Sequence, residues 1–344
     1  MVDWSARRKI AEDITEAAGL TPLLRLRKVA VGPQALCGKL EFMNPSASLK
    51  DRILRSMVNA AEERGDLRAG MTILEASTGS TGIATSLIGA VKGYPVVIVM
   101  PEGMSEERKA SMRAYGAELV LTPGAESDVD LCLDKVEELK RAQPGQYWEP
   151  GQFSNKDNIE AHYATTGPEI WEQTEGQVDV FVASQGSGGT VSGVGKFLKE
   201  KNPGVKIYAV EPAECPILSG GGWGPHAIEG IGDGFIPENL DLDYLDGVVT
   251  VSSADAIAMA RRLALEEGSL CGISSGCNVV AANKLTVALP DTKMIVTMIN
   301  DTGMRYFSTP LFGNEESVDI PDRDHPVRAE DRANLARHNL HIVN

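Results

Sequence analysis

Lys50 occupies the position in this sequence that best suits covalent chemistry. It lies in the segment Asn44–Arg52, in which Pro45 ends an extended stretch and Ser48 can cap a helix that begins near Lys50. A lysine at such a helix start would point into a cleft, where its amine can act as a nucleophile. Taken by itself, the same pattern is more typical of a solvated lysine in a first helical turn.

Two loops rich in glycine and hydroxyl side chains each follow a predicted strand and precede a predicted helix. In the loop Ser77–Gly82, the free N–H groups at the helix start suit a carboxylate. In the loop Gly186–Thr190, glycines allow a close approach and the N–H groups suit a phosphate, although the Walker lysine and the Gly-x-Gly-x-x-Gly spacing are missing. An unliganded cap explains the first loop equally well, and a plain tight turn also explains the second. A further segment, Cys271–Gly276, indicates only a turn that leads into a helix.

Apolar runs of strand type alternate with longer stretches of helical period, which is the pattern of α/β layers around mostly parallel sheets. The expected strands are 73–75, 96–100, 119–121, 178–183, 206–210, 248–251 and 294–298. The expected helices are 82–92, 106–115, 129–141, 254–267 and 278–289, with one more that ends at Lys201. Two such series predict two lobes with a boundary near 145–152. The tail from Asn314 is expected to be a surface extension whose last residues, 341–344, fray.

The composition limits the class of protein. The 344 residues carry a formal net charge of -15, which lacks the basic footprint of nucleic-acid binding and favours a small-molecule partner. The five cysteines are scattered and form no Cys-x-x-Cys pair, so we expect reduced thiols and no metal site. The first ten residues lack the apolar stretch of a secretory signal, and no apolar run has membrane-spanning length. We therefore expect a cytoplasmic protein that binds neither nucleic acid nor membrane.

Six motifs, in order along the chain, resemble those of the O-acetylserine sulfhydrylase (cysteine synthase) and cystathionine β-synthase family. They are Asn44–Arg52, Ser77–Gly82, Gly186–Thr190, Glu229–Gly232, Gly272–Gly276 and Asp301–Tyr306. The resemblance runs from about Thr21 to Phe312. It implies a pyridoxal 5'-phosphate enzyme of fold type II, similar to the tryptophan synthase β chain, with two three-layer α/β domains and the cofactor in the cleft between them. The implied domains are a smaller, mobile one at 46–151 for the substrate carboxylate, a larger one at 1–45 and 152–313 for the cofactor phosphate, and a C-terminal extension at 314–344.

The resemblance also implies roles for single residues. Lys50 matches the lysine that binds the cofactor covalently and later moves the Cα proton. Ser274 matches the serine beside the pyridine nitrogen, where a neutral hydroxyl moderates the electron sink and favours β-elimination over transamination. The residues matched to the cofactor phosphate are Gly186, Ser187, Gly188, Gly189 and Thr190. Those matched to the substrate and its α-carboxylate are Ser77, Thr78, Thr81, Gln152 and Gly230.

Two positions depart from the family pattern. Ser80 stands where many members carry an asparagine that contacts the phenolic oxygen of the cofactor, and we place Ser80 beside the cofactor as well. Asp233 stands in a loop where resembling enzymes carry Ala, Tyr or Arg. A catalytic acid there would repel hydrosulfide, attract an ammonium group or activate water. A solvated turn aspartate is an equally common explanation.

The breadth of the resemblance predicts a cysteine synthase, which replaces the acetate of O-acetylserine with sulfide and is expected to be a homodimer. Asp233 instead favours an enzyme that consumes cysteine and releases sulfide, by desulfhydrase, lanthionine synthase or cystathionine β-synthase chemistry. Two other classes stay open. In a nucleotide-binding oxidoreductase, Glu211 at the end of the strand after the glycine turn would bind a ribose. A catalytically silent binding protein is the other.

Overall fold

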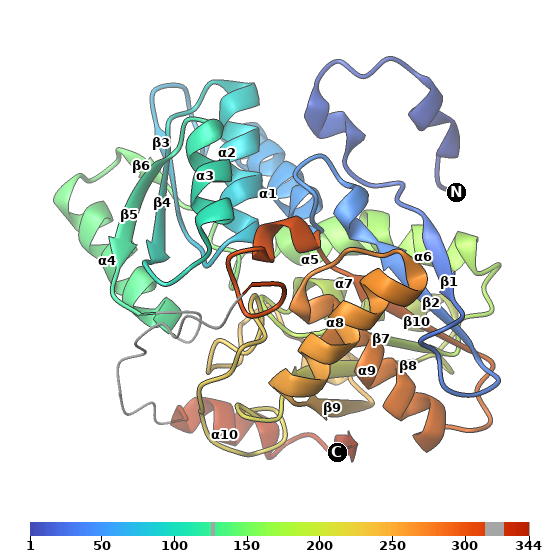
Figure 1. Ribbon diagram of the computed structural model, residues 1–344. Coiled ribbons are helices and arrows are strands. Elements are labelled where there is room, and N and C mark those ends of the chain that lie inside the picture. The colour runs from blue at the N-terminus through green and yellow to red at the C-terminus, as the bar shows by residue number, and fades with distance from the viewer. Residues whose placement is uncertain (125–127, 314–326, 344) are drawn as a thin grey trace.

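The strands of the protein form two sheets, each covered by helices (Figure 1). The computed structural model describes residues 1–124, 128–313 and 327–343. One sheet has four strands in the order β5-β4-β3-β6, and the other has seven in the order β1-β2-β10-β7-β8-β9-β11. Within the described ranges, β1 is antiparallel to β2 and every other pairing is parallel. The predicted α/β class is therefore confirmed.

The two central strands of the four-stranded sheet, β3 and β4, are buried along their whole length and are mostly apolar, whereas the outer strands β5 and β6 are partly exposed. Its strands are β3 (Thr72–Ala76), β4 (Val96–Pro101), β5 (Glu118–Thr122) and β6 (Tyr147–Trp148). Because successive side chains point to opposite faces, Ile73 and Ile98 pack against one helical layer and Leu74 and Val99 against the other. The first layer consists of α1 (Lys50–Arg64), α2 (Ser80–Lys92) and α3 (Glu106–Ala114), and the second of α4 (Val129–Ala142).

The seven-stranded sheet repeats this arrangement on a larger scale. Its strands are β1 (Leu23–Leu26), β2 (Ala35–Leu40), β7 (Val180–Ser184), β8 (Lys206–Pro212), β9 (Gly247–Val251), β10 (Met294–Ile299) and β11 (His341–Val343). Val182 and Val210 face one core, and Phe181 and Ala209 face the other. The first core is covered by α8 (Ser253–Glu267) and α9 (Ile273–Ala288), the second by α6 (Gly167–Gln173) and α7 (Gly189–Lys201). The short helices α5 (Asp157–Ala161) and α10 (Ala329–Leu335) complete the set of α-helices in the described ranges.

Each strand and helix expected from the sequence is present, with ends that differ by a few residues, apart from one longer difference. Helix α9 begins at Ile273, five residues before the expected start at position 278. The glycine at 276 suggested a turn, but it lies inside the helix, and a Cβ there would collide with the carbonyl of Ala256 in α8. The glycine therefore allows α8 and α9 to pack closely. The division into domains at positions 46 and 151 remains a prediction.

Three strands of the seven-stranded sheet, β1, β2 and β11, were not expected. Strand β2 was missed because Lys39 interrupts its apolar run, yet this lysine is fully buried and ion-paired. Residues 341–343, part of the stretch expected to fray, instead form β11, which pairs with β9, while Asn344 lies outside the described residues. Tyr208 accounts for the docking: its hydroxyl lies 3.2 Å from His341 Nδ1 and its ring contacts that of His341 edge-on. None of the helices in the described ranges has the length and apolar character needed to cross a bilayer.

A buried cluster of charges fixes the first turn of α1. Arg52 pairs with Glu41 through Nε (2.7 Å) and with Glu169 through Nη1 (2.7 Å), and all three side chains are at most 2% exposed. Lys39 adds a bond of 2.6 Å to Glu169. Because the partners come from the 3-10 helix Glu41–Met43, strand β2 and helix α6, the cluster ties the start of α1 to the body of the larger sheet.

We expect Glu169→Gln to lower the free energy of unfolding by about 3 kcal/mol, because it leaves Arg52 and Lys39 with one buried carboxylate fewer. Urea denaturation followed by circular dichroism measures this loss. Glu160→Gln, which changes an exposed glutamate of α5, is the control and should leave stability within about 0.5 kcal/mol. Equal stability of the two variants would contradict a stabilising role for the cluster.

Candidate active site

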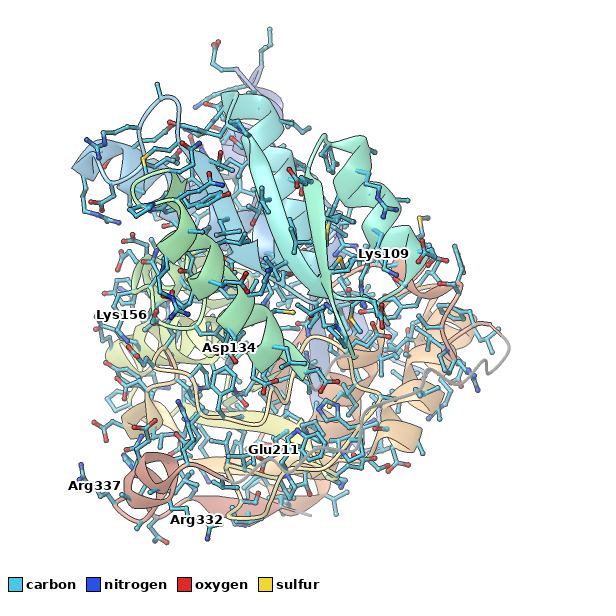
Figure 2. All side chains as sticks on the ribbon, turned by 90° about the vertical axis from the view of Figure 1, so that its left-hand side faces the viewer. Lys109, Asp134, Lys156, Glu211, Arg332 and Arg337 are labelled. Atoms are coloured by element: carbon cyan, nitrogen blue, oxygen red, sulfur yellow. The ribbon has the colours of Figure 1, made fainter. Side chains whose placement is uncertain are left out.

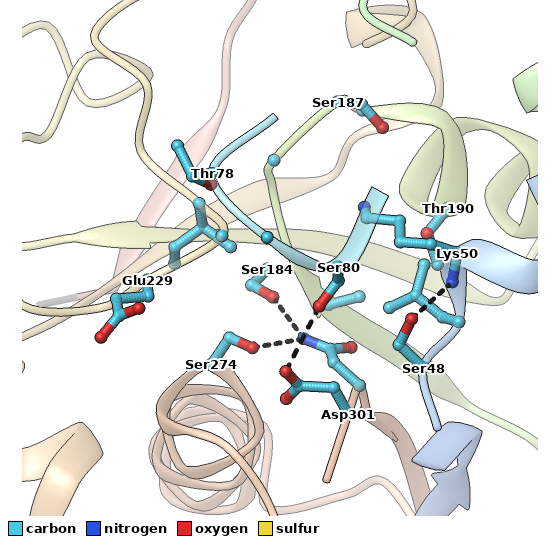
Figure 3. A pocket seen from close by; sticks show the side chains of 18 of the residues that line it. Ser48, Lys50, Thr78, Ser80, Ser184, Ser187, Thr190, Glu229, Ser274 and Asp301 are labelled. Carbon is cyan, nitrogen blue, oxygen red and sulfur yellow. Dashed lines mark hydrogen bonds between the residues drawn. The ribbon is translucent and has the colours of Figure 1, made fainter. Parts of the chain in front are cut away.

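A single pocket receives loops from both sheets and holds most of the residues expected in the site (Figure 3). Its walls include Ser48, Leu49, Lys50, Thr78, Gly79, Ser80, Arg108, Ser184, Gly186, Ser187, Gly188, Thr190, Glu229, Gly230, Ile231, Ser274, Asn300, Asp301 and Tyr306. An adjoining cavity shares Lys50 and adds Ser77, Thr81, Gln152, Phe153 and Asp233. Gly189 alone of the expected site residues lines neither space, because it lies behind the turn as the first residue of α7.

Lys50 is the first residue of α1, and its backbone N–H donates to the Ser48 hydroxyl at 3.3 Å. The expected helix start is thus present, but the N-cap residue is Leu49 and not the expected Ser48, and no side chain caps the helix. Desolvation lowers the pKa of the Lys50 amine, and the nearby carboxylates of Asp233, Asp301 and Glu75 oppose that shift. A lowered pKa increases the share of neutral amine, which is the form that can attack a carbonyl carbon or accept a proton.

The turn Gly186–Thr190 forms a cradle at the N-terminus of α7. Gly188 has a φ of 83°, which favours glycine. A Cβ at Gly186 would lie 2.5 Å from the carbonyl oxygen of Gly230, and one at Gly189 would collide with Asn158. The Asn158 amide donates to Ser187 Oγ at 3.0 Å and so fixes the turn from behind. Backbone N–H groups and the positive end of a 13-residue helix suit a phosphate, so the residues fit the anionic end of pyridoxal phosphate.

The loop Ser77–Gly82 connects β3 to α2. The Ser77 hydroxyl accepts from Gly79 N at 3.1 Å and from Gly82 N at 2.8 Å, so it holds the shape of the loop. Thr81 Oγ1 donates to Gln152 Oε1 at 2.6 Å. Thr78 lies on the wall of both cavities (Figure 3). The structure therefore brings the four expected carboxylate-binding residues together, with Ser77 and Thr81 also bonded to neighbouring parts of the protein.

Ser80 and Ser274 approach the pocket from different elements. Ser274, in the first turn of α9, accepts from Asn300 Nδ2 at 3.0 Å. Ser80, at the start of α2, accepts from Arg305 Nη1 at 2.7 Å and lies 3.4 Å from Asp301 Oδ2. The two serine hydroxyls are thus held by an amide and a guanidinium, and both belong to the lining of the same pocket.

Asp233 lies in the loop after Gly230, between two glycines with positive φ, Gly232 (73°) and Gly234 (83°). It lines the cavity that also contains Lys50 and Gln152. Desolvation lowers the pKa of Lys50, and among the nearby charges the Asp233 carboxylate does most to raise it again. Asp233 is therefore a half-buried loop residue on the wall of this cavity, and its catalytic role stays a prediction.

Sequence reasoning missed several residues of the site. Arg108 and Tyr306 line the pocket, and the Arg108 guanidinium lies 4.6 Å from the centre of the Tyr306 ring. Tyr306 donates to Asp301 Oδ2 at 2.8 Å. Tyr306 and Asp301 lay within a recognised motif, whereas Arg108 lies in an ordinary amphipathic helix that gave no signal. His162 lies behind the glycine turn with Nε2 3.1 Å from Thr190 Oγ1, and its burial lowers the pKa to about 3.

Glu211 does not serve as the ribose-binding acid of an oxidoreductase. It is 1% exposed, and its carboxylate accepts from Leu218 N at 2.7 Å and from both N and Oγ of Ser219. Burial raises its pKa to about 7. Figure 2 labels it in the lower body of the molecule, where its carboxylate closes the turn after β8.

Comparisons with known proteins agree with this geometry. Residues 14–301 match the family described as pyridoxal-phosphate dependent enzyme. Cysteine synthase 3 of Caenorhabditis elegans is 47% identical over 90% of this chain and 92% of its own length, and a cysteine synthase of Staphylococcus aureus is 45% identical over 90% and 99%.

Solved structures of similar proteins share the fold of this chain. The cysteine synthase of Entamoeba histolytica is 38% identical, covers 97% of both chains and superposes with a TM-score of 0.85. A hydrogen sulfide-producing enzyme of Fusobacterium nucleatum is 41% identical, with a TM-score of 0.83 over 86% of this chain and 100% of its own.

We expect Gly186→Ala to weaken the binding of pyridoxal phosphate by roughly tenfold or more, which corresponds to about 1.4 kcal/mol. The added methyl group would displace the Gly230 carbonyl and distort the cradle. Equilibrium dialysis of the apoprotein against the cofactor measures the affinity. Gly222→Ala, at a glycine whose Cβ would meet nothing within 4 Å, is the matched control. Unchanged affinity in both variants would show that the turn does not hold the phosphate.

Proposed function

Because the chain belongs to the family of pyridoxal-phosphate dependent enzymes, we propose that it is a cysteine synthase. It performs β-replacement on O-acetylserine with sulfide and forms cysteine and acetate. The observation that carries the proposal is a lysine with a lowered pKa in one pocket with a phosphate cradle, in a chain that is 45 to 47% identical to proteins named cysteine synthase. A silent binding protein would not need such a lysine.

Lys50 holds the cofactor and afterwards moves the proton of the substrate Cα. Desolvation makes both tasks possible, since a neutral amine is a nucleophile and a base. The cofactor, when bound, withdraws electrons from Cα. Gly186, Ser187, Gly188 and Thr190 would hold its phosphate, Gly189 would support their turn as the first residue of α7, and Ser80 and Ser274 would contact its ring. A serine beside the ring nitrogen, held by the neutral Asn300 amide, supports elimination because it does not enforce a positive ring.

The loop Ser77–Gly82 binds the α-carboxylate of the substrate. Thr78 and the N–H groups at the start of α2 provide donors, and the bonds of Ser77 within the loop keep those groups oriented. Gln152 is placed by its bond with Thr81. Gly230 leaves room for the substrate side chain opposite this loop. Fixing the carboxylate on one side orients the Cα–H bond toward Lys50.

A second candidate function is the release of sulfide from cysteine. It is favoured by Asp233, whose carboxylate lies in the cavity shared with Lys50 and acts electrostatically on its amine. An acid at this point attracts an ammonium group or activates water, and it disfavours an anionic nucleophile. The similarity to a hydrogen sulfide-producing enzyme gives further support.

The protein works as a cytoplasmic homodimer. All five cysteines are buried free thiols, which suits a reducing compartment. Met304, in the 3-10 helix Gly303–Tyr306, and Phe307, the residue that follows this helix, expose 61% and 52% of their surface, and a two-fold contact would cover such neighbouring apolar side chains.

We expect O-acetylserine with sulfide to give cysteine faster than cysteine alone gives sulfide, both measured in the steady state with the holoenzyme. Asp233→Asn should slow the release of sulfide from cysteine by about a hundredfold, because an amide cannot act as a base. It should not slow cysteine synthesis, because the neutral amide no longer repels hydrosulfide.

Three outcomes separate the two candidates. Faster sulfide release from cysteine would establish the second function, and absence of both reactions would refute the first as well. If Asp233→Asn changes neither rate, the aspartate has no catalytic part and the argument for the second function is lost.

A further inference from the structure

We propose that Arg108 is a positioning residue that holds two loops of the site in register: the carboxylate loop Ser77–Gly82 and the loop Glu229–Asp233. The inference rests on the proposed function for the meaning of these loops, but not for the contacts that connect them. Arg108 belongs to α3, which packs on the four-stranded sheet, and its side chain points toward the seven-stranded sheet. The side chain is nevertheless only 3% exposed.

On one side, Arg108 lies flat against the carboxylate loop. A Cβ added to Gly79 would be 2.5 Å from Arg108 Cδ and 2.6 Å from its Nε, so the loop backbone and the arginine side chain are in direct contact. Gly79 has a φ of 168° and a ψ of -82° and precedes the first residue of α2. Because Gly79 has no side chain, the Arg108 side chain can lie directly against the loop backbone.

On the other side, Arg108 contacts two side chains, Glu229 and Tyr306, from the part of the chain that is built around the seven-stranded sheet. Its Nη1 forms an ion pair with Glu229, whose side chain is 13% exposed, and its guanidinium stacks on Tyr306 with 4.6 Å to the ring centre. Glu229 is flanked by Ile228 and Ile231, which are buried in the core beneath α8 and α9. A buried pair of this kind persists only in one geometry, because separating the partners leaves uncompensated charge.

The partners of Arg108 lead directly to the reactive parts of the site. Gly230 follows Glu229 and packs against the phosphate turn, where its carbonyl would be 2.5 Å from a Cβ at Gly186. Asp233 lies three residues further along the same loop. Tyr306 donates to Asp301, which acts electrostatically on Lys50. One arginine therefore fixes the distance between the substrate loop and the loop that carries Gly230 and Asp233.

Charge gives Arg108 a second effect on substrate binding. Glu229, Asp233 and Asp301 all lie in the pocket or the adjoining cavity. The substrate is an amino acid and brings a carboxylate of its own. Arg108 neutralises Glu229, and without it the additional negative charge would oppose the substrate. Loss of Arg108 should therefore raise KM more than it lowers kcat.

Hydrogen–deuterium exchange of the holoenzyme tests the connection without any turnover. Arg108→Gln should raise exchange of the backbone amides in both loops, 77–82 and 229–233. Arg113→Gln removes the same charge from an exposed position of α3 and should change neither loop. If exchange rises in one loop only, or in neither, Arg108 does not connect them and the proposal is wrong.

Steady-state kinetics with O-acetylserine and sulfide provide the second readout. Arg108→Gln should raise KM by about tenfold, equivalent to about 1.4 kcal/mol of binding, with a smaller change in kcat. Adding Glu229→Gln to that variant removes the unpaired carboxylate and should restore KM at least partly. A double variant that binds substrate no better than Arg108→Gln would contradict the charge argument. If Arg108→Gln does not fold, Glu229→Gln alone should lower KM, because it removes a negative charge from the pocket, and a KM that does not fall would contradict the charge argument. If the wild type has no activity while the exchange result holds, the proposed function is wrong and the positioning role stands.

Discussion

The site depends on one constraint: the Lys50 amine must be able to lose its charge although carboxylates lie around it. Desolvation favours the neutral amine of Lys50, whereas Asp233, Asp301 and Glu75 favour the charged form. The balance requires that all four groups keep their positions. Lys50 stands at a helix start, and two residues later Arg52 binds that helix to the larger sheet through buried carboxylates. The cluster around Arg52 thus serves the site although none of its four side chains lines the pocket or the adjoining cavity.

The four-stranded sheet with its helices and the seven-stranded sheet with its helices form two bodies, and each contributes part of the site. The larger sheet offers the N-terminus of α7 with its glycine turn, and the smaller one offers the loop Ser77–Gly82. Neither set of donors is useful unless both face the same space, so contacts that cross between the bodies matter as much as the donors. Arg305 bonded to Ser80 and Arg108 paired with Glu229 are such contacts, and each brings a cation from one body to an oxygen of the other.

Much of this arrangement was predictable from the sequence, for physical reasons that can be named. Strands buried on both faces are apolar runs, and turns rich in glycine between strand and helix stand out in a sequence, so the segments that line the pocket around Lys50 were selected, while their roles stay predictions. Strand β2 was missed because Lys39 is compensated by Glu169, far away in the sequence. Arg108 was missed for the same reason, since its partners Glu229 and Tyr306 are distant along the chain. Local pattern predicts elements and loops, whereas buried charge pairs depend on the complete fold.

The covalent role of Lys50 is the central claim, and chemical trapping tests it most directly. Reduction of the holoenzyme with borohydride fixes the bond between cofactor and protein, and peptide mass mapping then locates the modified side chain. We predict a pyridoxyl group on the peptide that contains Lys50. A pyridoxyl group on another lysine, or none at all in a protein that retains bound cofactor, would contradict the account.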